Sequence, residues 1–404
     1  MIAKKTLGLI LAISLLGAPA SSFAKKKKKK DKVEGYQFTT LIDLPTTSVK
    51  DQHASGTCWC FSGLSFLESE LIRMGKGDMD LSEMFLVKKA YHEKAKLYVR
   101  YHGKLAFSGG GESNDVMDMI KLYGLAPESA FKGLNYGEEN HRHGEMDAVL
   151  EAMVNAVIKN RNRKLTPVWI KGIDATLDAY LGEDPTTFTY KDKSYTPKSF
   201  QKELGINPDD YVEITSFSHH PFYSKFIMEV PDNWAQGQVY NLPLDEFMST
   251  LNYALENGYS ALWGSDVSEK GFSSRNGVAI IPEVDTKNMS GAEIAKWEKM
   301  SQRDKNKKLY DFSRPGKEKV ITQEIRQEGF DNYQSQDDHG MHITGTAKDQ
   351  NGTLYFKVKN SWGDYNKYDG YFYASESFVK AKTMTYMIHK DALPKEIAKK
   401  LGIK

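Results

Sequence analysis

The sequence of 404 residues predicts an α+β fold, in which helices and strands occupy different parts of the chain. Runs of apolar residues at helical spacing dominate the first part, and they end at glycines. Alternating apolar residues, the pattern of half-buried strands, dominate the last part. No strand–helix–strand unit repeats along the chain, which argues against a parallel α/β sheet.

Three segments have the periodicity of amphipathic helices. In the first, Cys60, Leu64, Leu67 and Leu71 form one apolar stripe, and Gly75 can end the helix. The second and third segments are likewise followed by a glycine. The predicted helices cover residues 58–74, about 112–123 and 244–257.

Strands are expected mainly in the C-terminal part of the chain, where apolar residues alternate. Residues 281–315 are rich in charged side chains and predict an exposed excursion, with a polar helix capped by Ser290. A short helix is expected at 394–401. The predicted strands are 260–267, 341–347, 353–359, 370–374 and 383–388.

The N-terminus has the features of a secretory signal. Lys4 and Lys5 precede an apolar run of 11 residues, Leu7 to Gly17, which is too short to span a bilayer. Cleavage near Ala24 would leave a lysine-rich, disordered leader over residues 25–35. We therefore expect export to a periplasm or to the medium, with no stable membrane insertion. An uncleaved anchor helix is the alternative.

Composition limits the remaining function classes. The formal net charge of +2 gives no reason to expect a nucleic-acid partner. The chain contains only two cysteines, Cys58 and Cys60, which are two residues apart on one expected helix, point in nearly opposite directions and should not form a disulfide. A free thiol in an exported protein favours a functional reason for keeping it.

Cys58 is the better candidate for that function. It stands at the expected start of a helix, where the positive end of the helix dipole favours the nucleophilic thiolate. A buried, inert cysteine is the alternative. Cys60 belongs to the apolar stripe of the same helix and is expected to pack in the core.

A histidine and an amide that could serve such a thiol lie near the C-terminus. His339 precedes Asn360 by 21 residues, which leaves room for a strand, a turn at Asn351–Gly352 and a return strand. This hairpin would place the amide of Asn360 where it can orient the imidazole. Trp362 would then shield their hydrogen bond from water.

His342 competes with His339 for the role of the base. Three residues apart on a strand, the two side chains face opposite sides, so only one can face Cys58. The same geometry weakens a metal site built on Asp338, His339 and His342, for which the sequence offers no obvious third ligand. We expect no metal and no organic cofactor.

Four short motifs together resemble the papain-type cysteine peptidases. They are V-K-D-Q at 49–52, S-G-T-C-W at 55–59, H-G-M at 339–341 and N-S-W-G at 360–363. The wide separation of Cys58 and His339 is more similar to the bleomycin hydrolase/aminopeptidase C branch. The resemblance spans about residues 36–395 and implies a papain-like two-lobe fold, a helical lobe plus a β-rich lobe, with a large insertion at about 125–330 in a domain covering 36–404.

The resemblance also assigns roles to residues. Cys58 is the expected nucleophile, His339 the proton shuttle, and Asn360 its orienting partner, with H-G-M matching His339 rather than His342. Gln52 and the backbone N–H of Cys58 are expected to stabilise the oxyanion. Trp59 and Trp362 are supporting residues. Gly110 and Gly111 resemble glycines that line the cleft and bind substrate, although a flexible loop is the alternative.

The implied function is hydrolysis of peptide bonds through a Cys thioester, with peptides as substrates. In this branch an extended C-terminal tail enters the cleft and makes the enzyme an aminopeptidase, and homo-oligomers occur. Here only 16 residues, His389 to Lys404, follow the last expected strand. An aminopeptidase is therefore expected, with an open-cleft endopeptidase as the alternative. A non-catalytic peptide-binding or surface protein is the second alternative.

Overall fold

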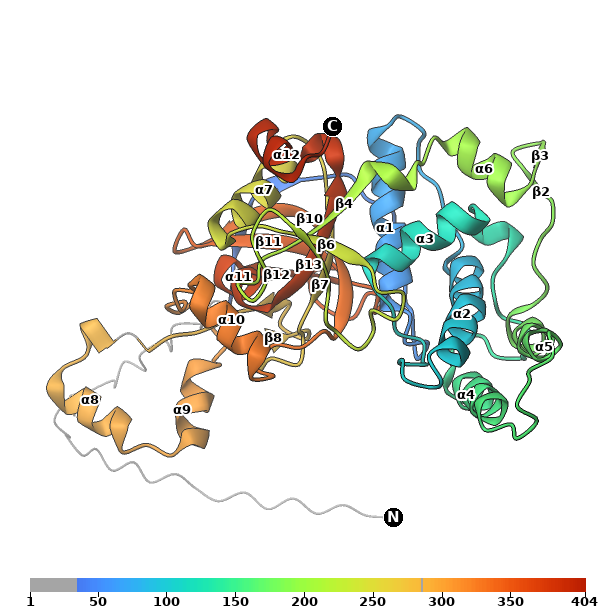
Figure 1. Ribbon diagram of the computed structural model, residues 1–404. Helices are drawn as coiled ribbons and strands as arrows, with labels where there is room; N and C mark the ends of the chain where they lie inside the picture. The colour runs from blue at the N-terminus through green and yellow to red at the C-terminus, as the bar shows by residue number, and fades with distance from the viewer. Residues whose placement is uncertain (1–34, 285) are drawn as a thin grey trace, which may run out of the picture.

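The computed structural model describes residues 35–284 and 286–404, and it shows two lobes side by side (Figure 1). Helices predominate in one lobe and a large sheet in the other. This confirms the predicted α+β class. The predicted signal peptide and nearly all of the predicted lysine-rich leader lie outside the described residues.

The helical lobe is built mostly from the first half of the chain. Its helices pack around one apolar core that includes Leu64, Phe85, Ile120 and Leu150. A small hairpin extends its edge. The elements are α1 (Cys58–Arg73), α2 (Glu83–Arg100), α3 (Ser113–Tyr123), α4 (Gly144–Ile158), α5 (Trp169–Leu181), β2 (Phe188–Tyr190), β3 (Lys193–Tyr195) and α6 (Pro197–Leu204).

Helix α2 was not predicted from the sequence. The Ser82 side chain caps it by accepting a hydrogen bond from the Phe85 N–H. The helix is buried on most sides because it packs against α1, α3, α4 and α5. Even Lys88 and Lys94 are buried, and their ammonium groups donate to oxygens of other segments. A helix enclosed in this way does not show a single apolar stripe.

The second lobe is built around an 11-stranded sheet. Its strand order is β5-β6-β4-β13-β7-β10-β11-β12-β9-β8, and β1 also pairs with β10. The strands are β1 (Phe38–Asp43), β4 (Tyr211–Thr215), β5 (Lys225–Ile227), β6 (Gln238–Asn241), β7 (Ala261–Ser265), β8 (Phe272–Ser273), β9 (Val278–Ala279), β10 (His339–Asp349), β11 (Leu354–Lys359), β12 (Tyr371–Ser375) and β13 (Thr383–His389).

Two layers cover the central strands of this sheet. Leu262 and Met387 face the core of the helical lobe, where α1 lies. Their neighbours Trp263 and Tyr386 face a second core on the opposite side of the sheet. The helices of the sheet lobe are α7 (Leu244–Glu256), α10 (Gln323–Asp331), α11 (Glu376–Lys382) and α12 (Lys395–Leu401). The sheet therefore separates α1 from the core that contains α7.

Most of the predicted elements are confirmed. Helices α1, α3 and α7 match the three predicted helices, and β7, β10, β11, β12 and β13 match the five predicted strands within a few residues. The largest difference is in β10, which begins at His339 rather than at 341 and so carries both candidate histidines.

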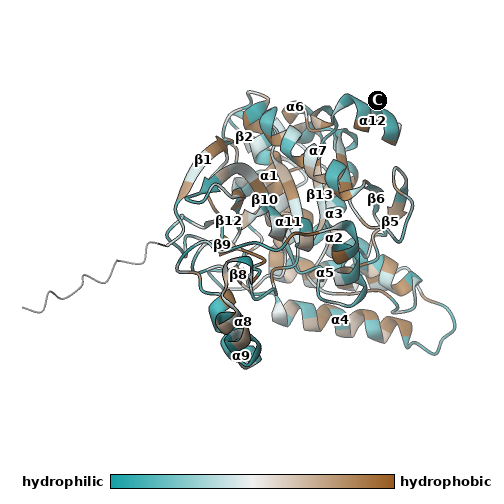
Figure 2. Cartoon of the chain, turned by 90° about the vertical axis from the view of Figure 1, so that its left-hand side faces the viewer, coloured by the Kyte–Doolittle hydropathy of each residue, from teal (hydrophilic) through white to brown (hydrophobic). Residues whose placement is uncertain are grey.

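The charged excursion is also confirmed. It contains α8 (Gly291–Glu298) and α9 (Gln302–Leu309), neither of which has a buried residue. Ser290 caps α8 in a reciprocal arrangement with Glu293, as the sequence predicts. Both helices project away from the sheet lobe (Figure 2). Across the described residues, no helix is both long enough and apolar enough to cross a bilayer.

Candidate active site

Cys58 is the first residue of α1, the helix of the helical lobe that packs against β10 and β7 of the sheet lobe. The turn before it requires Gly56, whose φ of 67° is the left-handed conformation that glycine adopts without strain. A hydrogen bond of 2.6 Å between the hydroxyls of Ser55 and Thr57 also holds this turn. The thiol is half-buried and unbridged. The helix dipole at this position favours a thiolate.

Strand β10 brings His339 to the first turn of α1. Its next residue, Gly340, packs so closely on this turn that a Cβ atom would lie 2.7 Å from the Ser62 Oγ and 3.1 Å from the Trp59 Cα. Only glycine fits there without displacing the helix. The backbone N–H of Gly340 also lowers the pKa of Cys58, which opposes the effect of burial. Gly340, which follows the expected base His339, therefore lies against the turn that carries the expected nucleophile Cys58.

Asn360 orients His339 by a side-chain hydrogen bond. The His339 Nε2 lies 2.8 Å from the Asn360 Oδ1. The same oxygen accepts from the Ser361 N–H at 2.8 Å, and the Asn360 Nδ2 donates to the Tyr365 hydroxyl at 3.2 Å. These contacts define the orientation of the amide. Because Oδ1 is an acceptor, His339 carries its proton on Nε2, which leaves Nδ1 free to take a proton from a thiol.

The Trp362 ring lies against the His339 ring beside this hydrogen bond. The Trp362 and His339 rings lie 4.7 Å apart between centroids, with an interplanar angle of 31°. His339 and Asn360 are both buried. Water is thereby kept from the His339–Asn360 bond, which strengthens it in the low local dielectric.

Burial favours the uncharged forms of both reacting groups. It raises the pKa of Cys58 to about 11 and lowers the pKa of His339 to about 4. At neutral pH the two groups are therefore a thiol and a neutral imidazole. Proton transfer creates two opposite charges at once, and each then stabilises the other against desolvation.

Gln52 lies beside Ser361, the residue that follows Asn360. Its backbone N–H donates to the Ser361 carbonyl at 2.8 Å, and its side-chain oxygen accepts from the Ser361 hydroxyl at 2.7 Å. Because Ser361 occupies the oxygen of the Gln52 amide, the NH₂ group is the end that can donate to a ligand. The geometry is compatible with the oxyanion role expected from the sequence.

The three consecutive glycines at 109–111 adjoin Trp59. The indole N–H of Trp59 donates to the Gly109 carbonyl at 2.9 Å, and a Cβ on Gly111 would lie 3.2 Å from the Trp59 ring. Gly110 already has partners within the chain, since its carbonyl accepts from Lys94 and its N–H donates to the Ser108 Oγ at 3.3 Å. Substrate that pairs with Gly110 would have to replace these contacts.

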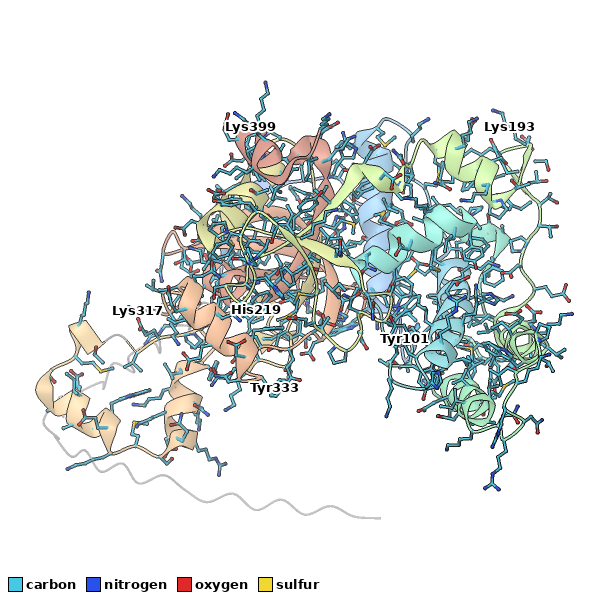
Figure 3. The ribbon with its side chains drawn as sticks, viewed as in Figure 1. Tyr101, Lys193, His219, Lys317, Tyr333 and Lys399 are labelled. Atoms are coloured by element: carbon cyan, nitrogen blue, oxygen red, sulfur yellow. The ribbon has the colours of Figure 1, made fainter. Side chains whose placement is uncertain are left out.

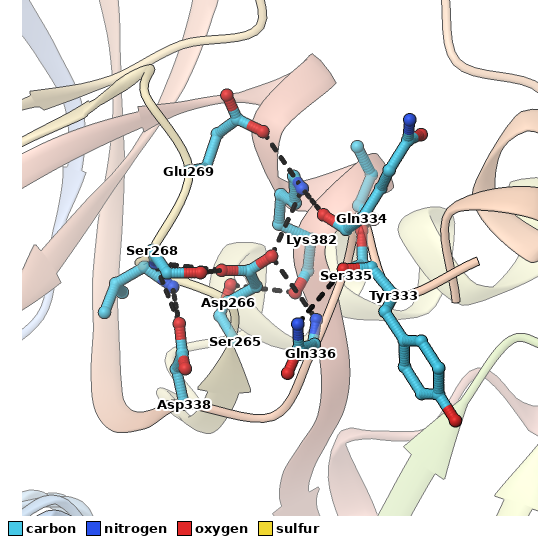
Figure 4. Close-up of polar contacts among 12 residues, drawn as sticks. Ser265, Asp266, Ser268, Glu269, Tyr333, Gln334, Ser335, Gln336, Asp338 and Lys382 are labelled. Carbon is cyan, nitrogen blue, oxygen red and sulfur yellow. Dashed lines mark hydrogen bonds and ion pairs between the residues drawn. The ribbon is translucent and has the colours of Figure 1, made fainter. Parts of the chain in front are cut away.

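The segment that leads into His339 is tied to the sheet lobe by charged side chains, of which Asp266 and Lys382 are buried (Figure 4). Asp338 accepts from the N–H groups of Val267 and Ser268 at 3.1 and 2.8 Å. Asp266 accepts from the Gln336 N–H at 3.3 Å and pairs with Lys382 at 3.2 Å. These contacts fix the start of β10, and with it the position of the His339 ring.

The other two candidates, Cys60 and His342, lie elsewhere in the core. Cys60 is fully buried and its thiol donates to the Glu83 carbonyl at 3.3 Å. His342 is fully buried, with Nδ1 3.0 Å from the Ser65 Oγ, and its ring packs on Phe66. Ser65 and Phe66 are in the second and third turns of α1, away from Cys58. Both residues therefore have packing roles.

Within the described residues, a possible metal-binding group consists of His219, His220 and Glu229. Figure 3 shows His219 on the sheet lobe, on the side of the molecule where Tyr333 also lies. The group does not include His339 or His342. It is separate from the site built around Cys58.

Sequence reasoning missed several residues that shape the site. Ser361 holds Gln52 and Tyr365 holds Asn360. Ser361 lies within a quoted motif, but its partner is 309 positions away, so the contact could not be read from the sequence. No local pattern singled out Asp232, which lies against Gly110.

Comparison with known proteins places this arrangement in a family. A model of the Peptidase C1-like family matches residues 16–313 and 291–403. Aminopeptidase G of Lactobacillus delbrueckii subsp. lactis is 24% identical over 399 residues, covering 88% of this chain and 83% of that protein. Aminopeptidase C of Streptococcus thermophilus is 24% identical over 414 residues, covering 89% of this chain and 84% of that protein.

The fold has a solved counterpart. The crystal structure of PepW from Lactobacillus rhamnosis HN001 aligns with a TM-score of 0.66 at 21% identity, covering 90% of this chain and 84% of that chain. The resemblance stated from the short motifs, and the papain-like fold it implies, are thereby confirmed. The family model and the relatives span both lobes. The chain therefore belongs to the Peptidase C1-like family and is a cysteine-type peptidase.

Proposed function

We propose that this protein is a cysteine aminopeptidase in which Cys58, His339, Asn360 and Gln52 carry out the reaction. The observation that carries the proposal is the 2.8 Å contact between the His339 Nε2 and the Asn360 Oδ1. This contact directs the basic Nδ1 of His339 away from Asn360. The residue after His339 is Gly340, which packs on the first turn of α1, where Cys58 lies. Cys58, His339 and Asn360 then supply the nucleophile, the base and the group that orients the base, as covalent catalysis requires.

In the proposed mechanism the Cys58 Sγ gives its proton to the His339 Nδ1 and attacks the substrate carbonyl carbon. The carbonyl π electrons move to oxygen, and the Gln52 NH₂ group and the Cys58 backbone N–H donate to this oxyanion. His339 returns the proton to the leaving amine as the C–N bond breaks, which leaves a thioester. Water, deprotonated by His339, then attacks the thioester and releases the acid and the thiol.

The aminopeptidase assignment rests on the relatives. The relatives are named aminopeptidase C and aminopeptidase G, and we extend that activity to peptides as substrates here. The chain leaves β13 at His389, which pairs with Tyr211. The other end of β13, Thr383, pairs with Ser265, the same residue that pairs with His339. The tail therefore departs at the end of the strand remote from His339.

The test compares fluorogenic amides of single amino acids with their N-acetylated forms, using the full chain. An aminopeptidase should cleave the free-amine substrates at least about tenfold faster, as measured by kcat/KM. A thiol-directed epoxide should abolish the activity and label Cys58. Faster cleavage of the N-acetylated substrates would show an endopeptidase instead. Absence of both labelling and hydrolysis would contradict the peptidase mechanism.

We further propose that the protein is exported after cleavage near Ala24, since an apolar run of suitable length follows two lysines. The N-terminal sequence of the mature protein, determined from a culture of the source cells, should start near Lys25. Recovery of Met1 in the cytosol would contradict this. Self-association, which the family resemblance implies, can be measured on the same material by light scattering.

A further inference from the structure

Two histidines and one glutamate converge on the sheet lobe, outside the proposed catalytic site. His219 and His220 lie in the segment between β4 and β5, and Glu229 stands two positions after the end of β5. One ligand atom from each of the three side chains lies within 4.8 Å of the other two. In the part of the chain that the structure describes, this is the one group of three such side chains that could share an ion.

The two imidazoles present the same ring nitrogen to the carboxylate of Glu229. The His219 Nε2 lies 2.7 Å from the Glu229 Oε2, and the His220 Nε2 lies 3.1 Å from the Glu229 Oε1. The two rings are 4.5 Å apart between centroids, with an interplanar angle of 55°. Two imidazole nitrogens and a carboxylate therefore meet at one point.

Aromatic packing fixes the orientation of both histidine rings. His220 stacks on Phe226 of β5 at 4.2 Å, and His219 stacks on Phe330 of α10 at 5.6 Å. The histidine side chains are still 26% and 31% exposed, so an ion from solvent can reach them. Rings held in this way lose little side-chain entropy when they bind a ligand.

The backbone that carries the histidines is held by a buried amide. The side-chain Nδ2 of Asn241, in β6, donates to the carbonyls of Phe217 and His220 at 2.8 and 3.0 Å. Its Oδ1 accepts from the Phe217 N–H at 2.9 Å. Asn241 is fully buried. The segment is thereby preorganised, as a metal site on a loop requires.

A second amide supports the far side of the His219 ring. The His219 Nδ1 lies 3.3 Å from the Gln327 Oε1 and 3.0 Å from the Gln327 Nε2. This amide is itself held, since its oxygen accepts from the Ser218 N–H at 2.6 Å and its nitrogen donates to Asp331 at 2.9 Å. Histidines that bind a metal usually donate their second N–H to such an acceptor. Gln327 can therefore hold the tautomer whose Nε2 lone pair is available to an ion.

We propose that His219, His220 and Glu229 bind a divalent transition-metal ion, and that zinc is the ion that fits them best. Zinc binds imidazole nitrogen and carboxylate oxygen, and three protein ligands with one water complete its tetrahedron. Magnesium and calcium prefer oxygen ligands alone. This site goes beyond the proposed function, and the expectation of no metal, drawn from the sequence, is then wrong for the sheet lobe.

The observed distances suit such an ion. Bonds of about 2.0–2.1 Å to a tetrahedral zinc place neighbouring ligand atoms about 3.3 Å apart. The nitrogen–oxygen distances of 2.7 and 3.1 Å require only a slight opening of the three side chains. The bound ion would link the segment after β4 to the segment after β5. It should therefore stabilise the folded state, because the unfolded chain does not hold the three ligands together.

The test is a calorimetric titration of zinc chloride into the full chain. The Cys58→Ala protein is the background, since its proposed nucleophile can no longer bind an ion. One equivalent of zinc should bind with a Kd of about 10 μM or lower. Glu229→Gln, which keeps the size of the side chain, should raise this Kd at least about tenfold, and so should His220→Ala. Magnesium chloride should give no binding heat.

Asp174→Asn is the matched control, because Asp174 also pairs with a histidine, His92 at 2.6 Å, but belongs to no group of three ligands. It should leave the Kd for zinc unchanged. Zinc should also raise the melting temperature of the background protein and of Asp174→Asn, but not that of Glu229→Gln.

X-ray absorption at the zinc edge identifies the ligands in the wild type. It should show nitrogen or oxygen at about 2.0–2.1 Å and no sulfur at about 2.3 Å. The proposal is overturned if the Cys58→Ala protein binds no zinc, or if folded Glu229→Gln and His220→Ala bind it as tightly. Equal binding of magnesium, or a sulfur ligand in the wild type loaded with one equivalent, would overturn it as well.

Discussion

The two lobes supply the two halves of the reaction in physically different ways. The helical lobe supplies Cys58 at the end of a helix whose position is determined by apolar packing around residues such as Leu64 and Leu67. The sheet lobe supplies His339 from the start of β10 and Asn360 from the residue after β11, where backbone pairing and buried charges determine position. Apolar packing tolerates small changes of side chain. A hydrogen-bonded constellation does not, since each lost partner leaves a buried polar group.

The largest expected difference lies between the two cysteines of the helical lobe. Cys58→Ala should reduce kcat by at least about a thousandfold, because no other group can form the thioester. Cys60→Ala, two residues along the same helix, should keep most of the activity and cost about 1 kcal/mol of stability. Hydrolysis of aminoacyl amides and thermal unfolding measure both effects. Loss of catalysis in a folded Cys60→Ala protein would mean that the thiols are assigned wrongly.

The buried ion pair of the sheet lobe should be the most sensitive point for stability. Lys382→Met leaves Asp266 and Glu269 without their partner, 3.2 and 3.0 Å away, and should cost about 3–5 kcal/mol. Lys380→Met, on the same helix, removes only the surface pair with Glu376 and should cost about 0.5 kcal/mol. Urea unfolding gives both values. Equal losses would show that the network around the start of β10 is not essential.

Loss of the Asn360 amide, which orients His339, should have an intermediate effect on activity. Asn360→Ala removes the acceptor of the His339 N–H and should lower kcat about 10- to 100-fold with little change in KM. Asn276→Ala, which removes an exposed side chain bonded to the Ser273 hydroxyl, serves as the control. The pH profile of kcat should also shift in Asn360→Ala, since His339 loses a partner that raises its pKa. An unshifted profile would assign Asn360 a structural role only.

The smallest expected effect is on the pH dependence of stability, and it arises at the interface between the lobes. Glu213 of β4 is buried there and accepts from the Thr385 hydroxyl at 2.6 Å. Burial raises the pKa of Glu213 from 4.5 to about 7. The folded state therefore binds a proton that the unfolded state has lost, so this contribution is present below about pH 4.5 and is lost as pH rises through 7.

The corresponding variant is Glu213→Gln, which keeps the hydrogen bond and removes the titration. Its stability should fall less than that of the wild type between pH 5 and about 8, as measured by thermal unfolding. Glu256→Gln, at an exposed position of α7, should follow the wild-type curve. Parallel curves for all three proteins would show that Glu213 is not protonated in the folded state.

Much of the site could be predicted because its parts carry local signals. The helix of Cys58 shows an apolar stripe and a terminal glycine, and the β10–β11 hairpin shows alternation on both sides of a turn. The motifs around Gln52, Cys58, His339 and Asn360 led to the family, which the comparisons confirm. Helix α2 was missed because the buried Lys88 and Lys94 interrupt its apolar pattern, and the partner of Lys88 is Asp178, 90 positions away.

The sequence by itself determined the α+β class, the main helices and strands, and the identity of the residues proposed to react. It could do so because each depends on spacing along a short stretch of chain. Only the tertiary structure decided that Ser361 holds Gln52 and that Asp232 meets Gly110. These contacts join segments that are more than a hundred positions apart. The contact of Asp232 depends on Trp234, two positions on, which packs in the core of the helical lobe, and no local pattern encodes which surfaces will meet.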